Sequence, residues 1–180
     1  MTSPTLTLTR SIVVEAAPGT LYQLCEGAEA LPALLRDVDS VERIGERTHR
    51  WKAGRGESRL AWETEAVRAD PPHRIGWRAR GEDLEEGFEG EVQFQALPGG
   101  GTEVRLILSG VSLPGASLIE AERVVDENLA SFKAAAEERS AASSRPEAAL
   151  DAQRAASMAD EGGEAAARVA GGTSVSTGKR

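Results

Sequence analysis

A long amphipathic stretch, Gly115 to Arg139, constrains the fold of this chain more than any other feature. At helical spacing its apolar residues fall on one stripe: Leu118, Val125, Leu129, Phe132 and Ala136. The opposite face suits water and carries Glu120, Arg123, Glu127, Ser131 and Ala134. Leaving a large apolar side chain in water costs roughly 1.5–3 kcal/mol, so another element must cover the stripe. Nearly everything upstream has the pattern of β-strands, and we expect a sheet to cover it.

The upstream residues alternate between apolar and polar in short runs, which is the pattern of half-buried strands. The predicted strands are 5–16, 38–44, 48–53, 59–69, 74–80, 87–97 and 103–111. Pro18 stands where the first turn of a helix tolerates a proline, and a short helix is predicted to continue from there over 20–25. A second short helix is predicted at 28–35. Short turns join most of the strands, which favours antiparallel pairing. The pattern predicts the α+β class, with a curved seven-stranded antiparallel sheet around the long C-terminal helix.

The composition changes near residue 140, where Ala, Gly, Ser and charged residues take over. Residues 140–180 contain few large aliphatic side chains and no stripe that could be buried. We therefore expect one domain over residues 1–139 and a disordered tail over 140–180.

Charge and cysteine content limit the partners and the compartment. The net charge is −8, and the acidic excess lies before the tail, a balance that disfavours nucleic acid and anionic membranes as partners. Cys25 is the only cysteine and is expected to be a buried, inert thiol. No apolar run approaches membrane-spanning length and no leader pattern begins the chain, so we expect a cytoplasmic protein. His49 and His73 lack neighbouring ligands at metal-binding spacing, and neither a metal nor another cofactor is predicted.

The order of these elements resembles a known superfamily. The residues that carry the resemblance lie between Ser11 and Glu138: 12–18, Leu31-Pro32, Trp51, 60–65, 74–78, 99–104 and 128–133. On these the chain resembles the START-like superfamily, in its polyketide cyclase/dehydrase and coenzyme Q-binding branch. The resemblance implies a helix-grip fold. It also implies functions such as those of aromatic polyketide cyclases and of lipid and quinone binders, but its motifs specify the fold better than the activity.

Aromatic residues on the inward face of the predicted strands suggest a ligand pocket. By alternation Trp51, Trp62 and Trp77 point inward, and Phe88 and Phe94 share this placement. They either line a cavity for an apolar ligand or form a solid core against the C-terminal helix. With the helix residues that face them, the predicted ligand-binding set is Arg10, Trp51, Trp62, Thr64, Trp77, Phe88, Phe94, Val125, Asn128 and Leu129.

Few polar residues qualify for chemistry inside such a pocket. Arg10 has inward parity and would bind an anion or carbonyl, meet a carboxylate, or extend to solvent at the end of the sheet. Thr64 and Asn128 could donate hydrogen bonds to a ligand or serve the structure alone. Glu122, beside the helix stripe, and His49, with inward parity, are the candidates for proton transfer. The alternatives are that Glu122 reaches solvent and that His49 is a satisfied core or rim residue.

Three functions are compatible with these residues: a binding protein for an apolar lipid, quinone or polyketide-like molecule, a cyclase/dehydrase-type enzyme, and an interaction domain with a filled core. The enzyme needs at least two inward polar groups that face one void. The binder needs mainly the void, and the interaction domain needs neither.

Overall fold

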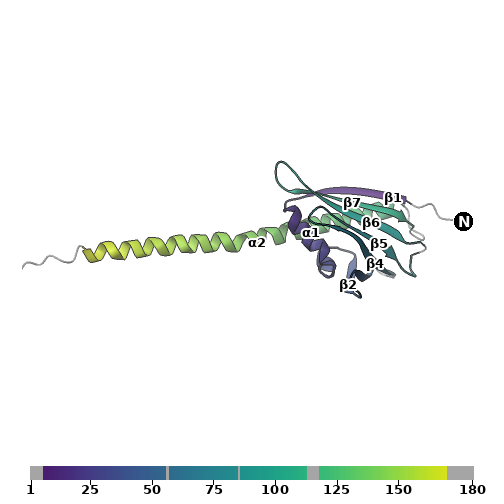
Figure 1. Ribbon diagram of the computed structural model, residues 1–180, viewed down its shortest axis with the longest axis horizontal. Coiled ribbons are helices and arrows are strands. Elements are labelled where there is room, and N and C mark those ends of the chain that lie inside the picture. The colour runs from purple at the N-terminus through teal and green to yellow at the C-terminus, as the bar shows by residue number, and fades with distance from the viewer. Residues whose placement is uncertain (1–5, 56, 85, 113–117, 170–180) are drawn as a thin grey trace, which may run out of the picture. The chain divides into compact units, whose positions relative to one another are not determined.

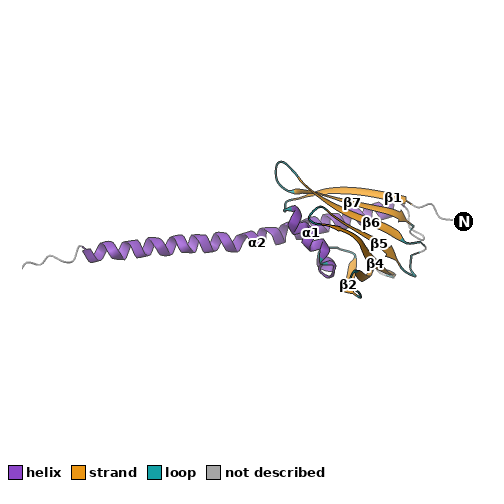
Figure 2. Cartoon of the chain, viewed as in Figure 1, coloured by secondary structure: helices purple, strands orange, loops and turns teal. Residues whose placement is uncertain are grey.

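The structure is a computed structural model that describes residues 6–55, 57–84, 86–112 and 118–169. Figure 2 separates its strands from its helices. In chain order the elements are β1 (Leu6–Val14), α1 (Pro18–Glu26), the 3-10 helix η1 (Ala28–Ala33), β2 (Val38–Arg43), β3 (Thr48–Arg55), β4 (Ser58–Asp70), β5 (Arg74–Arg80), β6 (Phe88–Ala96), β7 (Thr102–Val111) and α2 (Leu118–Val169). The predicted α+β class, with two short helices after the first strand, is confirmed.

All seven strands form one antiparallel sheet in the order β1-β7-β6-β5-β4-β3-β2. The first two strands of the chain therefore lie at opposite edges, and α1 and η1 carry the chain between them (Figure 1). The tight β6–β7 hairpin uses Gly100 and Gly101 at φ 96° and 77°, where a side chain would be strained. Parity along each strand then decides which side chains face the first part of α2.

Helix α2 is tied to both edges of the sheet. At the β1 edge, Lys133 Nζ donates to the carbonyl of Val13 at 2.7 Å, and the backbone N–H of Glu15 donates to Glu137 at 2.9 Å. Just before β2, the Asn128 side chain accepts the backbone N–H of Arg36 at 3.0 Å. The helix closes over an open sheet, and the helix-grip fold is confirmed.

The hydrophobic core gathers at one end of the space between sheet and helix. Its fully buried residues include Val14, Leu21, Leu34, Val104 and Ala136.

The α2 stripe contributes to this core only in part. Phe132 is 4% exposed, whereas Leu118 is 43% exposed, which corrects the expectation of a stripe buried from end to end. Only the later part of the stripe reaches the core, and Val125 and Leu129 face a cavity instead. Residues 115–117, the predicted start of the helix, lie outside the described residues.

The chain divides into two units, Met1–Ser140 and Ala141–Arg180. In the second unit α2 continues to Val169, a conformation that an alanine-rich sequence favours locally. No apolar stripe holds it in place, so the disorder expected over 140–180 stays a prediction. Within the described residues, no helix combines the length and the apolar character that crossing a membrane requires.

Candidate functional site

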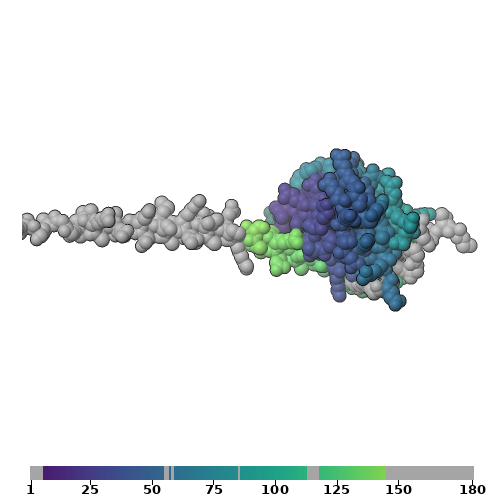
Figure 3. Space-filling view, turned by 90° about the horizontal axis from the view of Figure 1, so that it is seen from below, coloured from purple at the N-terminus to yellow at the C-terminus, as the bar shows by residue number. Residues whose placement is uncertain are grey.

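A cavity of about 850 Å³ lies between the inner face of the sheet and the helices α1, η1 and α2. The space-filling view in Figure 3 shows α1 and η1 (purple) adjoining the strands that follow them (blue). The volume of the cavity is within the range of small-molecule sites, roughly 300–1,000 Å³. Its wall is mainly apolar, with residues from β3 to β7 facing Val125, Leu129 and Phe132 of α2. The stripe and the sheet thus leave space between them.

All three tryptophans line this cavity. Trp51 and Trp62 are cross-strand partners on β3 and β4, and their rings stack with centroids 5.9 Å apart at 11°. Trp77 lies on β5, and Phe88 on β6 contributes beside it. Phe94, also predicted to line the pocket, is 3% exposed and packs edge-on against Tyr22, with centroids 6.1 Å apart. It belongs to the core and not to the cavity wall.

The indole N–H groups of the cavity differ in their partners. Trp51 Nε1 donates to Thr64 Oγ1 at 2.8 Å. Within the described residues, the N–H groups of Trp62 and Trp77 make no hydrogen bond, and the Thr64 hydroxyl donates none. The wall therefore has donor groups that could donate hydrogen bonds to an oxygen atom of a ligand.

His49 also lines the cavity, as the cross-strand partner of Thr64. Burial lowers the pKa of His49, an effect that Arg43 adds to and Glu29 opposes. The imidazole is thus held neutral at pH 7 and can act as either donor or acceptor. His49 and Thr64 thus place two polar side chains next to each other in a mainly apolar wall.

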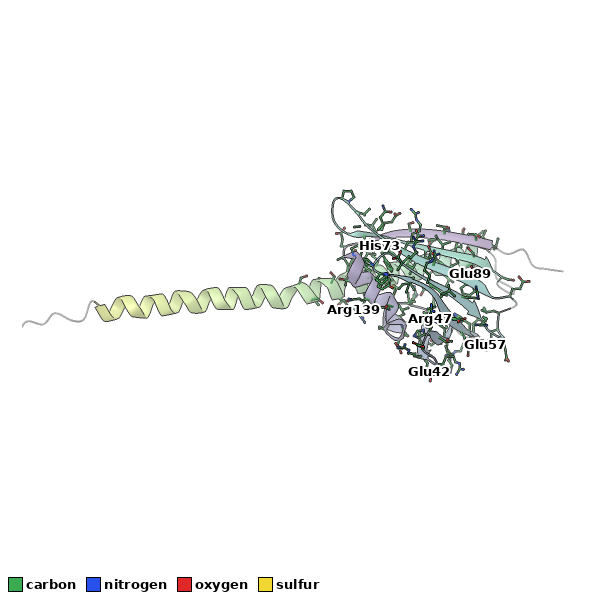
Figure 4. All side chains as sticks on the ribbon, in the orientation of Figure 1. Glu42, Arg47, Glu57, His73, Glu89 and Arg139 are labelled. Carbon is green, nitrogen blue, oxygen red and sulfur yellow. The ribbon has the colours of Figure 1, made fainter. Side chains whose placement is uncertain are left out.

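Exposed charged residues line the cavity where it meets the surface. The β2–β3 hairpin supplies Arg43, Glu46 and Arg47, and η1 supplies Glu29. Arg43 holds the hairpin by donating to the carbonyls of Gly45 at 3.1 Å and Glu46 at 2.7 Å. Figure 4 labels Arg47 in this region. Residues of both signs of charge are thus present at the mouth.

Arg10 and Glu122 lie outside the cavity wall. Arg10 has the predicted inward parity, but its guanidinium reaches α2 and forms ion pairs at 3.0 Å with Glu122 and with Asp126. The hydrogen bond to Glu122 is the main reason that the pKa of Arg10 is raised. Of the alternatives for Arg10, the structure shows the carboxylate partner, and this pairing also removes Glu122 from proton transfer in the cavity.

Asn128 lines the cavity, but its amide is engaged elsewhere. Its Oδ1 accepts the N–H groups of Arg36 at 3.0 Å and Asp37 at 3.3 Å. Its Nδ2 donates to Asp37 Oδ2 at 3.1 Å and to the carbonyl of Val124 at 2.8 Å. Both donors and both acceptor positions are occupied, which favours the structural alternative for Asn128.

Four cavity residues on α1 were missing from the predicted ligand-binding set: Tyr22, Gln23, Cys25 and Glu26. Tyr22 is 3% exposed, burial raises its pKa, and its hydroxyl has no hydrogen-bond partner in the described residues. The inward polar groups of the strands were identified from strand alternation, and this signal does not apply to the helix α1. The one available signal for Tyr22 was its neighbour Leu21, which was predicted to point inward. Burial raises the pKa of Cys25 to about 12, in agreement with an inert thiol. The described residues contain no cluster of metal-ligating side chains.

Solved structures of other proteins have a similar fold. The protein TTHA0849 of Thermus thermophilus is 26% identical, with a TM-score of 0.58 and coverage of 78% of this chain and 99% of that one. The Zhui aromatase/cyclase of a Streptomyces species has a TM-score of 0.64 at 16% identity, covering 76% and 96%. A START superfamily protein of Mycobacterium smegmatis has a TM-score of 0.60 at 14% identity, covering 74% and 96%. The last two identities are low, so these likenesses concern the fold alone.

Sequence comparison gives the family. No curated protein matches the chain. A family model described as polyketide cyclase / dehydrase and lipid transport matches residues 14–133, from the end of β1 to the packed part of α2. The matched region contains every described residue of the cavity wall. The chain belongs to the polyketide cyclase/dehydrase and lipid transport family.

Proposed function

We propose that this protein binds an apolar small molecule in the cavity between the sheet and α2. The observation that carries the proposal is the volume of about 850 Å³ behind a mainly apolar wall. Burying apolar ligand surface there gains about 25 cal/mol per Å² before the costs of association. A side-chain-filled core, as an interaction domain would have, does not fit a space of this size.

The ligand we infer carries at least one hydrogen-bond acceptor. The N–H groups of Trp62 and Trp77 have no hydrogen-bond partner among the described residues, and the hydroxyl of Thr64 accepts from Trp51 but donates to none of them. All three groups stand in a mainly apolar wall. A donor without a partner in such surroundings costs free energy that an acceptor on the ligand would recover. This favours an apolar body with a carbonyl or hydroxyl group, as lipids, quinones and polyketides have, over a pure hydrocarbon.

A substitution that fills the cavity tests the proposal. Leu106 faces the cavity from β7, whereas the next residue, Ile107, points to the other face of the sheet. We expect Leu106→Trp to reduce Nile red uptake by about tenfold or more and Ile107→Trp to leave it unchanged. Native mass spectrometry of the purified full-length protein should show a co-purifying apolar molecule that Leu106→Trp lacks. Absence of dye uptake and of any bound molecule in the unaltered protein would refute a binding function.

Enzymatic cyclisation or dehydration is the second candidate. It is favoured by His49 and Thr64, two polar residues on adjacent strands that face the same void. A neutral His49 could take a proton from a carbon next to a ligand carbonyl, and a donor such as Thr64 could hold the carbonyl oxygen. If this holds, His49→Gln abolishes product formation from a poly-β-ketone substrate but leaves Nile red uptake intact. A binding protein without catalysis yields no product in either form.

A further inference from the structure

Trp77 and Gly90 form a cross-strand pair in the cavity wall. The two residues are direct partners in the β5–β6 register. Phe88 and Val92, on the same face of β6, line the cavity on either side of Gly90. Gly90 is buried and does not line it, because the indole of Trp77 lies over its Cα.

No side chain fits beneath this indole. A Cβ atom built on Gly90 would meet Cε2 and Cζ2 of Trp77 at clashing distances and Nε1 at 2.6 Å. Ordinary contacts between such atoms need about 3.5–4.0 Å, so a single methyl group would push the indole outward by about 1–2 Å. The displacement is directed into the cavity, because β6 closes the other side.

We propose that Gly90 is a specificity-determining residue that sets how large a ligand the cavity accepts. By letting the Trp77 indole lie against β6, it keeps the volume near the upper end of the range for small-molecule sites. The ligand class is then a long-chain or multi-ring apolar molecule. This inference rests on the proposed binding function and adds a selection by size.

An alternative is that Trp77 covers Gly90 only to stabilise a strand that a glycine weakens. That role predicts a change in stability with no change in ligand preference. The two roles are separable because the backbone at Gly90 has no positive φ, so alanine can adopt its conformation without strain.

The experiment measures displacement of Nile red by n-alkanols from octanol to hexadecanol. The variants are Gly90→Ala, Trp77→Ala and both together, in the full chain. Gly76→Ala is the control: a buried glycine of β5 outside the cavity wall, where a Cβ would lie 3.3 Å from Arg68 Cβ. For Gly90→Ala we expect octanol to bind as in the unaltered protein and hexadecanol to bind about tenfold more weakly. Gly76→Ala should keep the original length profile. Trp77→Ala should extend the preference toward longer chains, and adding Gly90→Ala to it should have no further effect.

Several outcomes would overturn the inference. One is a folded Gly90→Ala protein with the original length profile, and another is equal weakening at every length. If Gly90→Ala does not fold, Trp77→Ala decides, because an unchanged preference there contradicts size selection by this pair. If the unaltered protein binds neither Nile red nor any alkanol, the proposed function itself fails. Binding without a length-dependent effect refutes only the role of Gly90.

Discussion

Trp51 Nε1 donates a hydrogen bond to Thr64 Oγ1 across 2.8 Å, from β3 to the neighbouring strand β4. This bond fixes the edge of an indole whose face stacks on Trp62 at 5.9 Å. Thr64 is only 6% exposed, so water cannot easily replace its hydroxyl. One buried side chain thus holds the aromatic part of the cavity wall in place.

Replacing Thr64 by valine should therefore destabilise the protein. The shape of the side chain is nearly kept, but the N–H of Trp51 loses its acceptor, at a cost of about 1–3 kcal/mol. Urea unfolding measures the change, and Thr64→Ser, which keeps the hydroxyl, is the matched control. Equal stability of the valine and serine variants would show that this bond does not contribute.

Asn128→Ala should loosen the attachment of α2 to the segment before β2. The substitution leaves the N–H groups of Arg36 and Asp37 without their acceptor, and we expect a loss of about 1–3 kcal/mol in the free energy of unfolding. Under conditions in which the variant is folded, its affinity for Nile red should stay within about twofold of that of the unaltered protein, because the Asn128 amide is hydrogen-bonded within the protein itself. A fully stable variant that no longer binds the dye would instead assign Asn128 to the ligand.

The sequence was sufficient to predict the strand faces, because strand periodicity is a local property. Alternation alone placed Trp62, Trp77 and His49 on the inner face, and the structure has each of them in the cavity wall. The same parity rule placed Arg10 inward, where it meets α2.

The sequence could not reveal relations between distant segments. Asn128 is bonded to Asp37, 91 residues away, and nothing local to either residue signals the pairing. The cavity is a second case, because unfilled space depends on the summed volumes of many side chains from separate elements. The contact of Trp77 with Gly90 belongs here as well, since it requires the β5–β6 register.

Stability and ligand affinity should both fall as the pH drops below about 6.5. Burial lowers the pKa of His49 in the folded protein, so the unfolded chain binds the proton more readily in the window between the ordinary and the lowered value. Proton uptake in this window therefore favours the unfolded chain. The stabilisation is fully present above the window and is lost as the pH falls through it. An apolar ligand desolvates His49 further and should bind less well to the protonated form.

Thermal unfolding and Nile red titrations between about pH 7.5 and 5.5 measure this dependence. His49→Gln should flatten both curves, whereas His73→Gln, at an exposed position, should leave them unchanged. Identical pH curves for His49→Gln and the unaltered protein would remove His49 as the titrating group.

Removal of the residues after Ser144 should leave the thermal midpoint of the remaining domain unchanged. Among the α2 side chains that the structure describes, up to residue 144, the last buried one is Ala136, and the family match ends at residue 133. The removed segment has no apolar stripe, so we expect no packing contribution from it to the stability of the domain. Far-UV circular dichroism of both forms then tests the predicted disorder: a disordered tail adds little helical signal, whereas the α2 conformation adds a large one that depends on temperature. A lower midpoint for the shortened chain would instead mean that the removed segment packs on the domain.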